Sequence, residues 1–549
     1  MVRILVSDAM SEEGLAPLLA DPTIEVVQKK VSEVEDELDQ FDALLVRSAT
    51  KVTEQLLQKM TNLKIVGRAG VGVDNIDVDA ATRYGVVVIN APNGNTISTA
   101  EHTFAMMASL VRRIPQAHIS VKSREWNRSA FVGIELFGKH LGIIGFGRIG
   151  SEVAKRARAF GMHVHVYDPF LTKARAEKIG VDVCTLDALL AQADIITVHT
   201  PLTKETKGLL GQKNLAKTKK GVYLINCARG GIIDEQALIP FLENGHVAGV
   251  ALDVFEQEPP GDHPLLSFDN VVVTPHLGAS TVEAQVNVAT QVAEEVLTFL
   301  QGKPVTSSIN LPTLSKDVYE KIQAFYTLAR KMGILASQYM SEPVQEIAIT
   351  YSGSVADLET TFITRSLLAG FLKPRVASTV NEVNAAMIAK ERGIAFSEKF
   401  SANGNDYNSS ITLTVYGENK TFTLKGTHIA HYGDRIVHFN GFAIDFAPEG
   451  HLLYIQHHDK PGMIGKVGNI LGDHQVNIAT MQVGRQEAGG KAIMMLSLDK
   501  PLDDALVETL EQISDIDVVK RLEYKRFSRA AEPFFIQVEP LFVPLYKTS

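Results

Sequence analysis

The sequence LGIIGFGRIGSEVAKRARAFGMHVHVYD, residues 141–168, decides the fold of this chain. It begins with a short apolar strand, continues through the glycine turn GFGRIG (145–150) and a helix-compatible run, and ends in a second apolar strand at Asp168. Strand, G-x-G-x-x-G turn, helix, strand and acid in this order are typical of a dinucleotide-binding βαβ unit. The chain holds 41 glycines, so the prediction depends on the flanking elements more than on the glycine spacing.

Each position of the turn has its own physical task. Gly145 permits a tight turn, Gly147 lets the backbone approach a pyrophosphate, and Gly150 allows close helix–strand packing. The helix that follows presents unpaired N–H groups to phosphate. Asp168, which lies 18 residues after Gly150, can bind a ribose diol and repel a 2′-phosphate, which favours NAD over NADP. The alternative is an α/β turn that binds no phosphate.

Length and composition limit the class of protein. The 549 residues suggest roughly three to four domains, and 45% hydrophobic with 21% charged residues fits a soluble globular chain. A net charge of −9 argues against a nucleic-acid partner. The two cysteines, Cys184 and Cys227, fit a reducing compartment. No signal peptide and no membrane-spanning apolar run is evident, so we expect a cytoplasmic protein without a membrane partner.

The first hundred residues also alternate between short β-branched runs and helical stretches, which predicts a second parallel α/β unit. This unit lacks a G-x-G-x-x-G turn of its own, so it is not expected to bind the dinucleotide. Arg47 and Arg68 follow two of its strands, and ligands in such sheets lie at the carboxyl ends of strands. The two arginines could converge on one anionic substrate or be solvated loop charges.

The segment between the two α/β units predicts a connection and an arm. Ser98-Thr99-Ala100-Glu101 reads as a capping box that begins a long helix toward Ile114. Residues 120–139 are less regular and include Trp126, so they either pack on a second subunit or fold back on their own domain. A helix over 282–300 is expected to return to the first unit, which makes the first domain discontinuous.

The C-terminal part of the chain changes character after Gly302. Residues 311–450 mix helices, expected over 318–339 and 380–392, with strands, and suggest a spacer or oligomerisation domain. Residues 451–524 follow the order β-α-β-β-α-β, which is ferredoxin-like. We assign no element and no role to the tail, residues 525–549.

Three residues after the glycine turn suggest a reaction. Arg229 and His276 end two strands, and Glu258 lies in the loop DVFEQEP (253–259). Hydride transfer from a secondary alcohol to NAD needs a base for the hydroxyl proton, and histidine suits that role near neutral pH. A carboxylate fixes the tautomer of the imidazole, and a guanidinium holds an α-carboxylate. Each residue alone could be structural, but together at one sheet edge they indicate a dehydrogenase.

The chain resembles the D-isomer-specific 2-hydroxyacid dehydrogenases, and within them the long forms that act on 3-phospho-D-glycerate. The resembling segments are VRSATKVT (46–53), GRAGVGVDNID (67–77), GFGRIG (145–150), NCARGGIIDE (226–235), ALDVFEQEP (251–259) and TPHLGAS (274–280). The later part resembles an intervening domain followed by an ACT regulatory domain around HHDKPG (457–462). The resemblance ends near residue 524.

The resemblance implies an α/β fold. A discontinuous flavodoxin-like substrate domain (1–97 plus 282–310) surrounds an inserted Rossmann domain (98–281). An α+β intervening domain (311–450) and a ferredoxin-like ACT domain (451–524) follow. The implied activity is NAD-dependent oxidation of 3-phospho-D-glycerate to 3-phosphohydroxypyruvate, the first step of L-serine biosynthesis, with reduction of 2-oxoglutarate as a side activity. L-serine as an effector, a homotetramer and no metal are also implied.

The resemblance also assigns residues. The catalytic trio is Arg229, Glu258 and His276. The residues implied to bind NAD are Val71, Gly145, Gly147, Arg148, Ile149, Gly150, Asp168, Thr200, Pro201, Cys227, Ala228, Arg229, Asp253, His276, Leu277, Gly278 and Ala279. The residues implied to bind substrate are Arg47, Arg68, Gly70, Asn93, Gly94 and Asn95. Those implied to bind serine, between ACT domains, are His457, Asp459 and Asn477.

Two other functions are compatible with the same fold. One is a hydroxypyruvate or glyoxylate reductase, which would not need a phosphate site such as the arginine pair Arg47 and Arg68 or a regulatory C-terminal third. The other is an NAD-sensing scaffold of the corepressor type, which would show negligible turnover.

Overall fold

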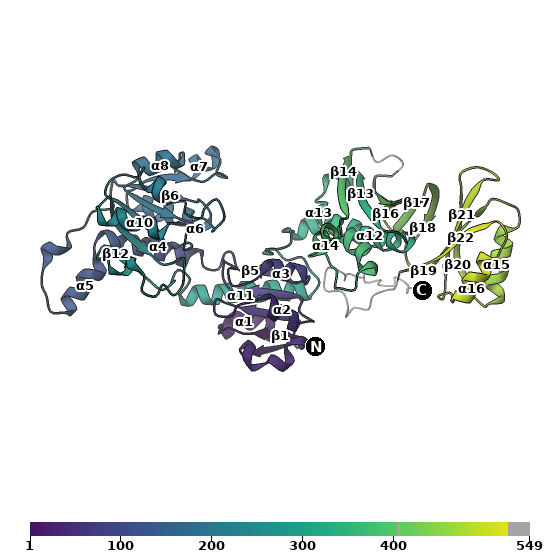
Figure 1. The fold of residues 1–549 in the computed structure, drawn as a ribbon, viewed down its shortest axis with the longest axis horizontal. Coiled ribbons are helices and arrows are strands. Elements are labelled where there is room, and N and C mark those ends of the chain that lie inside the picture. The colour runs from purple at the N-terminus through teal and green to yellow at the C-terminus, as the bar shows by residue number, and fades with distance from the viewer. Residues whose placement is uncertain (404–406, 525–549) are drawn as a thin grey trace, which may run out of the picture.

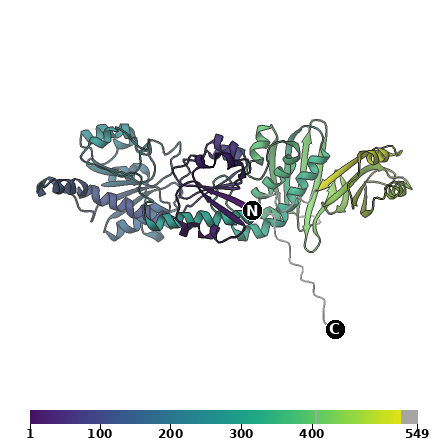
Figure 2. The ribbon, with the colours of Figure 1, turned by 90° about the horizontal axis from the view of Figure 1, so that it is seen from below.

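The described residues form four β-sheets that follow one another along an elongated molecule (Figures 1 and 2). The structure is a computed structural model that describes residues 1–403 and 407–524. The sheet with the glycine turn lies at one end, the sheet of the first hundred residues is next to it, and the two C-terminal sheets follow (Figure 1). Among the described residues, no helix is both long enough and apolar enough to span a bilayer.

The first unit, which we call the flavodoxin-like unit, is a parallel sheet of order β2-β1-β3-β4-β5. Its strands are β1 (Val2–Val6), β2 (Ile24–Gln28), β3 (Ala43–Val46), β4 (Ile65–Arg68) and β5 (Val87–Asn90). Its helices are α1 (Glu12–Leu19), α2 (Glu54–Lys59) and α3 (Val78–Arg83), with 3-10 turns at Val31–Glu33 and Glu35–Gln40. The strand order confirms the flavodoxin-like prediction.

Helix α11 (Val282–Leu300) returns to the flavodoxin-like unit, as predicted. It packs against α1 and β4 and buries a stripe made of Val288, Val292 and Val296. Residues of the second unit therefore lie between two segments of the first, which confirms the discontinuous fold. The hydrophobic stripe fixes α11 on the sheet because each valine lies about one turn after the previous one.

The second unit, the Rossmann unit, is a seven-stranded parallel sheet of order β12-β11-β10-β9-β6-β7-β8. Its strands are β6 (His140–Ile144), β7 (His163–Tyr167), β8 (Asp182–Val183), β9 (Ile195–Val198), β10 (Val222–Asn226), β11 (Val247–Leu252) and β12 (Val271–Val273). Its helices include α6 (Arg148–Ala159), α7 (Lys173–Ile179), α8 (Leu186–Gln192), α9 (Gln212–Leu215) and α10 (Glu235–Glu243), with 3-10 turns at Arg128–Phe131 and Pro264–Ser267. Hydrophobic clusters cover both faces of the sheet, so the predicted doubly wound fold is confirmed.

The predicted capping box at Ser98 is wrong. Helix α4 (Thr96–Val111) begins two residues earlier, with Asn95 as its N-cap residue. Ser98 lies inside the helix, where its hydroxyl donates to the carbonyl oxygen of Gly278 at 2.8 Å. The prediction failed because the Ser98 hydroxyl bonds a loop that is distant in the sequence, and it does not cap the N–H groups of its own helix.

A short helix, α5 (Ile114–Lys122), projects away from the rest of the chain together with the residues that follow it (Figure 1). Trp126 is 81% exposed, and Val132 and Phe137 are 76% exposed. The projecting part of the predicted arm is α5 with the residues around Trp126, whereas Ile134 and Leu136 pack against the core of the Rossmann unit. Exposed apolar side chains of this size on a projecting segment are typical of an interaction surface.

The third unit, which we call the mixed-sheet unit, has six strands in the order β14-β13-β15-β16-β17-β18. The strands are β13 (Val344–Gly353), β14 (Ala395–Ser401), β15 (Ser409–Gly417), β16 (Thr421–Ile429), β17 (Gly433–Phe439) and β18 (Phe442–Phe446). Its helices are α12 (Lys316–Tyr339), α13 (Thr361–Leu372) and α14 (Ala385–Glu391), with 3-10 turns at Ser354–Asp357 and Lys373–Arg375. Helix α13 was not predicted.

The helix predicted over 380–392 is only partly present, because residues before Ala385 form a loop. Within that loop Asn384 Oδ1 accepts a hydrogen bond from Asn381 N, and Asn381 Oδ1 accepts one from Val383 N. The asparagine side chains thus replace helical hydrogen bonds with local turns. Asn381 Nδ2 also donates to the carbonyl oxygen of Gly85 at 2.7 Å, which ties this loop to the flavodoxin-like unit.

The C-terminal unit confirms the predicted β-α-β-β-α-β order. It consists of β19 (Gly450–His458), α15 (Met463–Asp473), β20 (Ile478–Arg485), β21 (Lys491–Leu498), α16 (Asp504–Glu511) and β22 (Ile516–Tyr524). The sheet order is β20-β21-β19-β22. Gln338 of α12 accepts a hydrogen bond from Glu523 N at 2.8 Å and donates one to the Glu523 carbonyl oxygen at 2.7 Å. The side chain thus satisfies both backbone groups of one residue on the edge strand β22. The tail, 525–549, lies outside the described residues.

Candidate active site

The three glycines of the turn 145–150 have the surroundings expected for a tight turn, for open space at a phosphate and for close helix packing. Gly145 has φ +93°, and a Cβ there would lie 2.7 Å from the carbonyl oxygen of His199. A Cβ on Gly150 would lie 2.3 Å from the carbonyl oxygen of Gly145, so close packing of α6 excludes a side chain. A Cβ on Gly147, by contrast, would meet no atom within 4 Å. The turn therefore leaves open space in front of the N-terminus of α6, which suits a pyrophosphate.

Asp168 lies at the end of β7 and is bonded to the glycine turn. Its Oδ2 accepts a hydrogen bond from Phe146 N at 2.7 Å, and its Oδ1 accepts one from Phe170 N at 2.8 Å. Each carboxylate oxygen keeps a second lone pair that a ribose hydroxyl can use. The hydroxyl Oγ1 of Thr200, on the loop after β9, is buried without a hydrogen-bond partner, so a further polar group of this edge can bind a ligand.

His276 and Glu258 form the predicted pair. His276 Nδ1 lies 2.9 Å from Glu258 Oε2, and both side chains are partly exposed. Burial raises the pKa of Glu258, but its hydrogen bond and charge interaction with His276 outweigh that effect, and the net pKa is lowered. Glu258 therefore stays ionised and accepts the Nδ1 proton, which leaves Nε2 with its lone pair available as a base.

The backbone at His276 is in the left-handed region, with φ +55°. Asp253, whose side chain is 1% exposed, lies beneath this loop. Its carboxylate accepts hydrogen bonds from Leu277 N and Gly278 N at 2.7 and 2.9 Å and from Thr274 Oγ1 at 2.6 Å. Asp253 thus holds the loop that presents His276, and its predicted contact with NAD stays a prediction.

Three arginines meet at the edge of the flavodoxin-like unit that faces the Rossmann unit. Arg229 Nε lies 3.1 Å from Asp74 Oδ2, a contact that joins the two units. Burial lowers the pKa of Arg68 to about 10, and the positive charges of Arg229 and Arg47 contribute to the same shift. The Arg68 guanidinium remains charged at neutral pH, so the site has an excess of positive charge that an anionic substrate would neutralise.

The predicted substrate loop, Asn93 to Asn95, lies against α11. A Cβ on Gly94 would come within 2.8 Å of Val288 N, and Asn93 N donates to Gln291 Oε1 at 3.3 Å. The side-chain oxygen of Asn95 is buried without a partner. The loop is thus held against α11 of the flavodoxin-like unit immediately before α4 begins. Gly70 is held under Arg68, because a Cβ there would overlap the guanidinium.

The remaining predicted NAD residues lie after carboxyl ends of strands. Those of the Rossmann unit follow β9, β10 and β12 and are Thr200, Pro201, Cys227, Ala228, Leu277, Gly278 and Ala279. Burial raises the pKa of the Cys227 thiol to about 12, so the thiol is neutral. Val71 follows β4, and its carbonyl oxygen accepts a hydrogen bond from Asn90 Nδ2. The roles of these residues toward NAD stay predictions.

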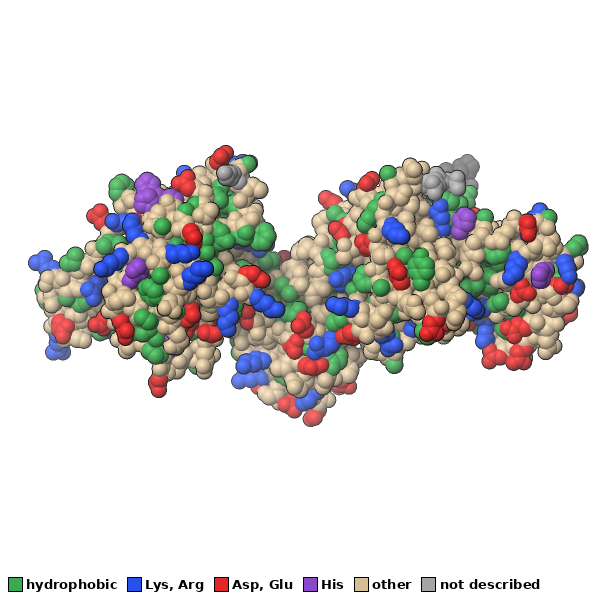
Figure 3. All heavy atoms as spheres, turned by 45° about the horizontal axis from the view of Figure 1, so that its top comes forward, with side chains coloured by type: hydrophobic (Ala, Val, Ile, Leu, Met, Phe, Trp, Pro, Cys, Tyr) green, Lys and Arg blue, Asp and Glu red, His purple; other side chains and the backbone are tan. Residues whose placement is uncertain are grey.

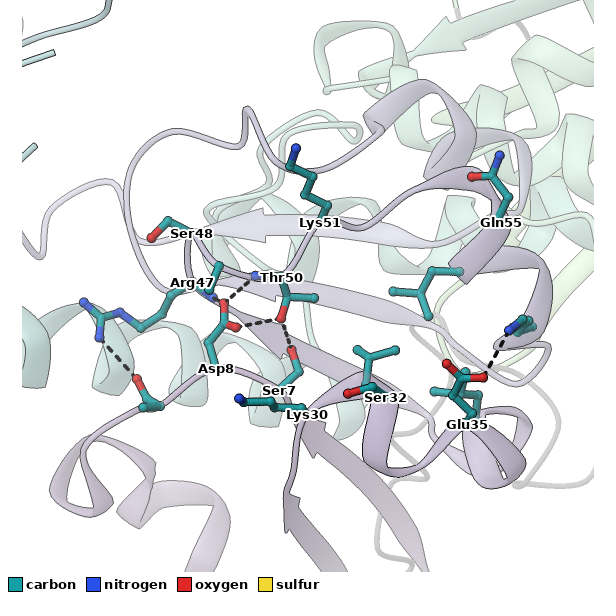
Figure 4. Close-up of a pocket in the computed structure, with 16 residues that line it drawn as sticks. Ser7, Asp8, Lys30, Ser32, Glu35, Arg47, Ser48, Thr50, Lys51 and Gln55 are labelled. Atoms are coloured by element: carbon teal, nitrogen blue, oxygen red, sulfur yellow. Dashed lines mark hydrogen bonds and ion pairs between the residues drawn. The ribbon is translucent and has the colours of Figure 1, made fainter. Parts of the chain in front are cut away.

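A cavity of about 840 Å³ opens at the carboxyl ends of β1, β2 and β3 (Figure 4). Asp8 accepts hydrogen bonds from the backbone N–H groups of Arg47 and Thr50 and from the Thr50 hydroxyl. The Arg47 guanidinium points away from the cavity and donates to the carbonyl oxygen of Ala9 at 3.2 Å (Figure 4). Figure 3 shows the molecular surface hollowed between the Rossmann unit and the C-terminal units, with Lys and Arg side chains among Asp and Glu.

The predicted effector residues are not brought together within one chain. His457 is 2% exposed, and Asp459 binds Arg485 and Gly489 N. Asn477 precedes β20, whose first residue pairs with Leu498, whereas His458 pairs with Lys491 at the other end of β21. The two ends are roughly 23 Å apart at ~3.3 Å per residue.

Two residues of this site were not predicted. Asp74 pairs with Arg229, and His102 of α4 contacts Asp253. Asp74 lies in the segment GRAGVGVDNID, which follows a predicted strand. That position could have marked it as a site residue. No motif in the sequence marks His102. It contacts Asp253 only because the fold brings helix α4 next to the loop after β11.

Comparison with known proteins identifies the family. The description "D-isomer specific 2-hydroxyacid dehydrogenase, NAD binding domain" matches residues 104–278. "D-3-phosphoglycerate dehydrogenase intervening domain" matches 321–440, and "ACT domain" matches 451–515. The D-3-phosphoglycerate dehydrogenase of Bacillus subtilis (strain 168) is 66% identical over 523 residues, which cover 95% of this chain and 100% of the relative. This chain belongs to the D-3-phosphoglycerate dehydrogenase family.

Other members and more distant structures agree with this assignment. The D-3-phosphoglycerate dehydrogenase of Archaeoglobus fulgidus is 45% identical over 94% of this chain and 98% of the relative. The crystal structure of a glyoxylate reductase from Paecilomyes thermophila, 30% identical, covers 56% of this chain and 98% of its own with a TM-score of 0.52. The TT0316 protein from Thermus thermophilus is similar, with 31% identity, coverage of 56% and 100%, and a TM-score of 0.51. NAD is the cofactor, as the family description states.

A test of cofactor choice follows from Asp168. Replacing Asp168 with alanine is expected to reduce the preference for NAD over NADP by about tenfold or more, because a carboxylate no longer repels the 2′-phosphate. The ratio of kcat/KM for the two cofactors measures this effect. Asp168→Asn is the matched variant, because it keeps an acceptor for Phe146 N without the charge. Unchanged discrimination in both variants would assign cofactor choice to other residues.

Proposed function

We propose that this chain oxidises 3-phospho-D-glycerate to 3-phosphohydroxypyruvate with NAD, the first step of L-serine biosynthesis. The observation that supports this reaction is the His276–Glu258 pair, 2.9 Å apart, at the edge where Arg229, Arg68 and Arg47 gather. A base and an excess of positive charge are what the oxidation of an anionic 2-hydroxyacid requires. The relatives named D-3-phosphoglycerate dehydrogenase support the phosphorylated substrate.

The residues then have distinct roles in the reaction. The glycine turn and Asp168 would hold NAD, which would supply the acceptor for the hydride that leaves C2 of the substrate. His276 Nε2 takes the proton of the C2 hydroxyl, and Glu258 holds the imidazole by its Nδ1 proton and stabilises the resulting imidazolium. Arg229 binds the α-carboxylate, and in the reverse direction it polarises the carbonyl. The proton returns from His276 to the same oxygen on reduction.

The substrate phosphate is assigned to Arg68 and Arg47. The lowered pKa of Arg68, about 10, reflects a half-buried cation beside two others, and a phosphate dianion would relieve that repulsion. Arg47 binds Ala9 through a single hydrogen bond to a carbonyl, so its guanidinium can turn toward a stronger anionic partner. We extend the substrate site to Gly70 and the Asn93–Asn95 loop, which borders the same edge.

The competing function is a hydroxypyruvate or glyoxylate reductase. A solved glyoxylate reductase has the same fold, so the fold alone does not distinguish phosphoglycerate oxidation from glyoxylate reduction. The deciding measurement is kcat/KM for 3-phospho-D-glycerate against D-glycerate. We expect a preference for the phosphorylated acid of more than about 100-fold, as two arginines contribute. Equal values would overturn the proposal, and absent turnover with either acid would favour an NAD-sensing scaffold.

The pH dependence of the reaction tests the pairing of His276 with Glu258. In Glu258→Gln we expect a lower kcat and an acid limb of the kcat/KM profile that moves to lower pH, because the carboxylate that stabilises the imidazolium is gone. The lowered pKa of Glu258 means that it is ionised throughout the neutral range, so its own titration does not produce the limb. A profile that superimposes on the wild type would contradict the pairing.

We further propose a homotetramer with L-serine as effector, bound between two C-terminal units. Within one chain Asn477 lies at the opposite end of the sheet from His457 and Asp459, so a twofold pair of units could complete the site. The exposed arm around Trp126 supports association of subunits. Titration calorimetry of the full chain with L-serine tests binding, with Asn477→Ala and Asp459→Ala as variants. Binding that survives both substitutions would place the effector elsewhere.

A further inference from the structure

The first turns of α4 bind the loop that carries His276. Ser98 Oγ and Thr99 Oγ1 donate to the carbonyl oxygen of Gly278 at 2.8 and 3.1 Å. One turn later, His102 Nε2 lies 3.1 Å from Asp253 Oδ1 and 3.2 Å from Thr274 Oγ1. Because Ser98 and His102 are four residues apart, they lie on one face of the helix. That face is therefore bonded to both ends of the loop 274–278.

The loop needs these contacts because its backbone is strained. A non-glycine residue at φ +55°, as in His276, is strained and persists only where the surroundings hold it. His276 N donates to the carbonyl oxygen of Asp253 at 2.9 Å, and the next two N–H groups donate to the Asp253 carboxylate. The position of His276 thus depends on the orientation of the Asp253 side chain.

His102 is the side chain that contacts Asp253 from α4. Asp253 is an ionised acceptor, because hydrogen bonds from His102, Thr274 and Leu277 keep its pKa low in spite of burial. His102 Nε2 must therefore carry a proton and donate it. Cys227, a neutral thiol, also lies beside His102. One ligand atom each of His102, Cys227 and Asp253 lies within 4.8 Å of the others, a spacing that a metal ion could use. Four donors already contact the Asp253 carboxylate, so we interpret the cluster as a hydrogen-bonded group and not as a metal site.

We propose that His102 is a positioning residue of the active site, which orients Asp253 and Thr274 and thereby sets the direction of the His276 imidazole. The inference rests on the proposed base role of His276. Helix α4 begins directly after the Asn93–Asn95 loop. Through His102 this one helix fixes the distance between the substrate loop and the base. A displacement of the base by about 1 Å can lower turnover by about 100-fold.

The test compares two replacements of His102 in the full-length enzyme. His102→Leu removes the N–H donor, and His102→Gln keeps an N–H donor that can reach Asp253. We expect the leucine variant to lose about 10- to 100-fold in kcat, with KM for phosphoglycerate and the dissociation constant of NAD within about threefold of wild type. The glutamine variant is expected to recover kcat to within about threefold. If His102→Leu does not fold, His102→Phe replaces it with the same expectations.

A matched control is His246→Gln, because His246 Nε2 also bonds a threonine hydroxyl, Thr218 Oγ1 at 3.0 Å, in the same unit. It should leave kcat unchanged. The proposal is overturned if the leucine variant keeps wild-type kcat, if glutamine and leucine are equally impaired, or if NAD affinity falls in proportion to kcat. Failure of the proposed function itself is recognised separately, since wild-type enzyme would then not oxidise phosphoglycerate or His276 could be replaced without loss.

Discussion

Replacing His276 with alanine is expected to lower kcat for phosphoglycerate oxidation by about 10²- to 10⁴-fold, the usual contribution of a general base. The physical reason is that Nε2 is the proton acceptor at this edge, with Glu258 bonded to the opposite nitrogen. The binding of NAD is expected to change by less than about threefold, because the glycine turn and Asp168 are bonded independently of His276. Stopped-flow measurement of NADH formation and calorimetric titration with NAD give the two quantities.

The left-handed backbone at His276 requires a second variant. Alanine is strained at φ +55°, so part of its effect could come from a shifted loop. His276→Asn is the better test, since asparagine tolerates this conformation and cannot act as a base near neutral pH. His163→Ala, at an exposed histidine that begins β7 at the opposite edge of the sheet, is the control. If NAD affinity and kcat fell equally in the asparagine variant, His276 would be a binding residue and not the base.

The features that the sequence predicted well are those that depend on local chemistry. Gly145 and Gly150 could be assigned from spacing, because a Cβ at either position collides with backbone that lies close in the same unit. The two parallel α/β units followed from the alternation of β-branched runs and helices, and their flavodoxin-like and Rossmann topologies were implied by the family resemblance. The pairing of His276 with Glu258 was also predictable, as both residues follow strands that end at one edge of the sheet.

The features that were missed depend on partners distant in the chain. Ser98 reads as a helix cap by its spacing from Glu101, but its hydroxyl bonds Gly278, 180 residues away. The bonds from the Asp253 carboxylate to Leu277 N and Gly278 N join two strand ends and could not be read from the sequence. The loop before α14 was predicted as helix, although Asn381 and Asn384 favour turns; the bond from Asn381 Nδ2 to the carbonyl oxygen of Gly85, 296 residues away, fixes the turn and could not be predicted.

The largest effect on stability is expected at Glu382, whose side chain is fully buried in the mixed-sheet unit. Its Oε1 accepts hydrogen bonds from Tyr326 Oη at 2.6 Å and from Arg330 Nη1 at 2.9 Å. Arg330 is 4% exposed, so its charge has little access to water. Arg365 donates to the backbone carbonyl oxygens of Glu382 and Val383 and holds the same loop from α13. Burial and the Glu382 charge raise the pKa of Tyr326, so the phenol stays a donor.

Glu382→Ala is expected to destabilise this unit by about 3–5 kcal/mol, because a buried guanidinium loses its carboxylate. Glu382→Gln keeps an acceptor and should cost less, about 1–3 kcal/mol. The surface control is Asp187→Ala, which breaks an exposed pair with Lys217 and should cost less than about 1 kcal/mol.

Because the chain has several units, hydrogen exchange measured peptide by peptide is the suitable readout. Peptides from α12 and from residues 379–392 should exchange faster in Glu382→Ala, while those of the glycine turn, 141–168, stay unchanged. The loop also holds the carbonyl of Gly85, so peptides before β5 should respond more weakly. Equal protection in Glu382→Ala and wild type would mean that the buried pair contributes no net stability and that apolar packing around α12 alone maintains this unit.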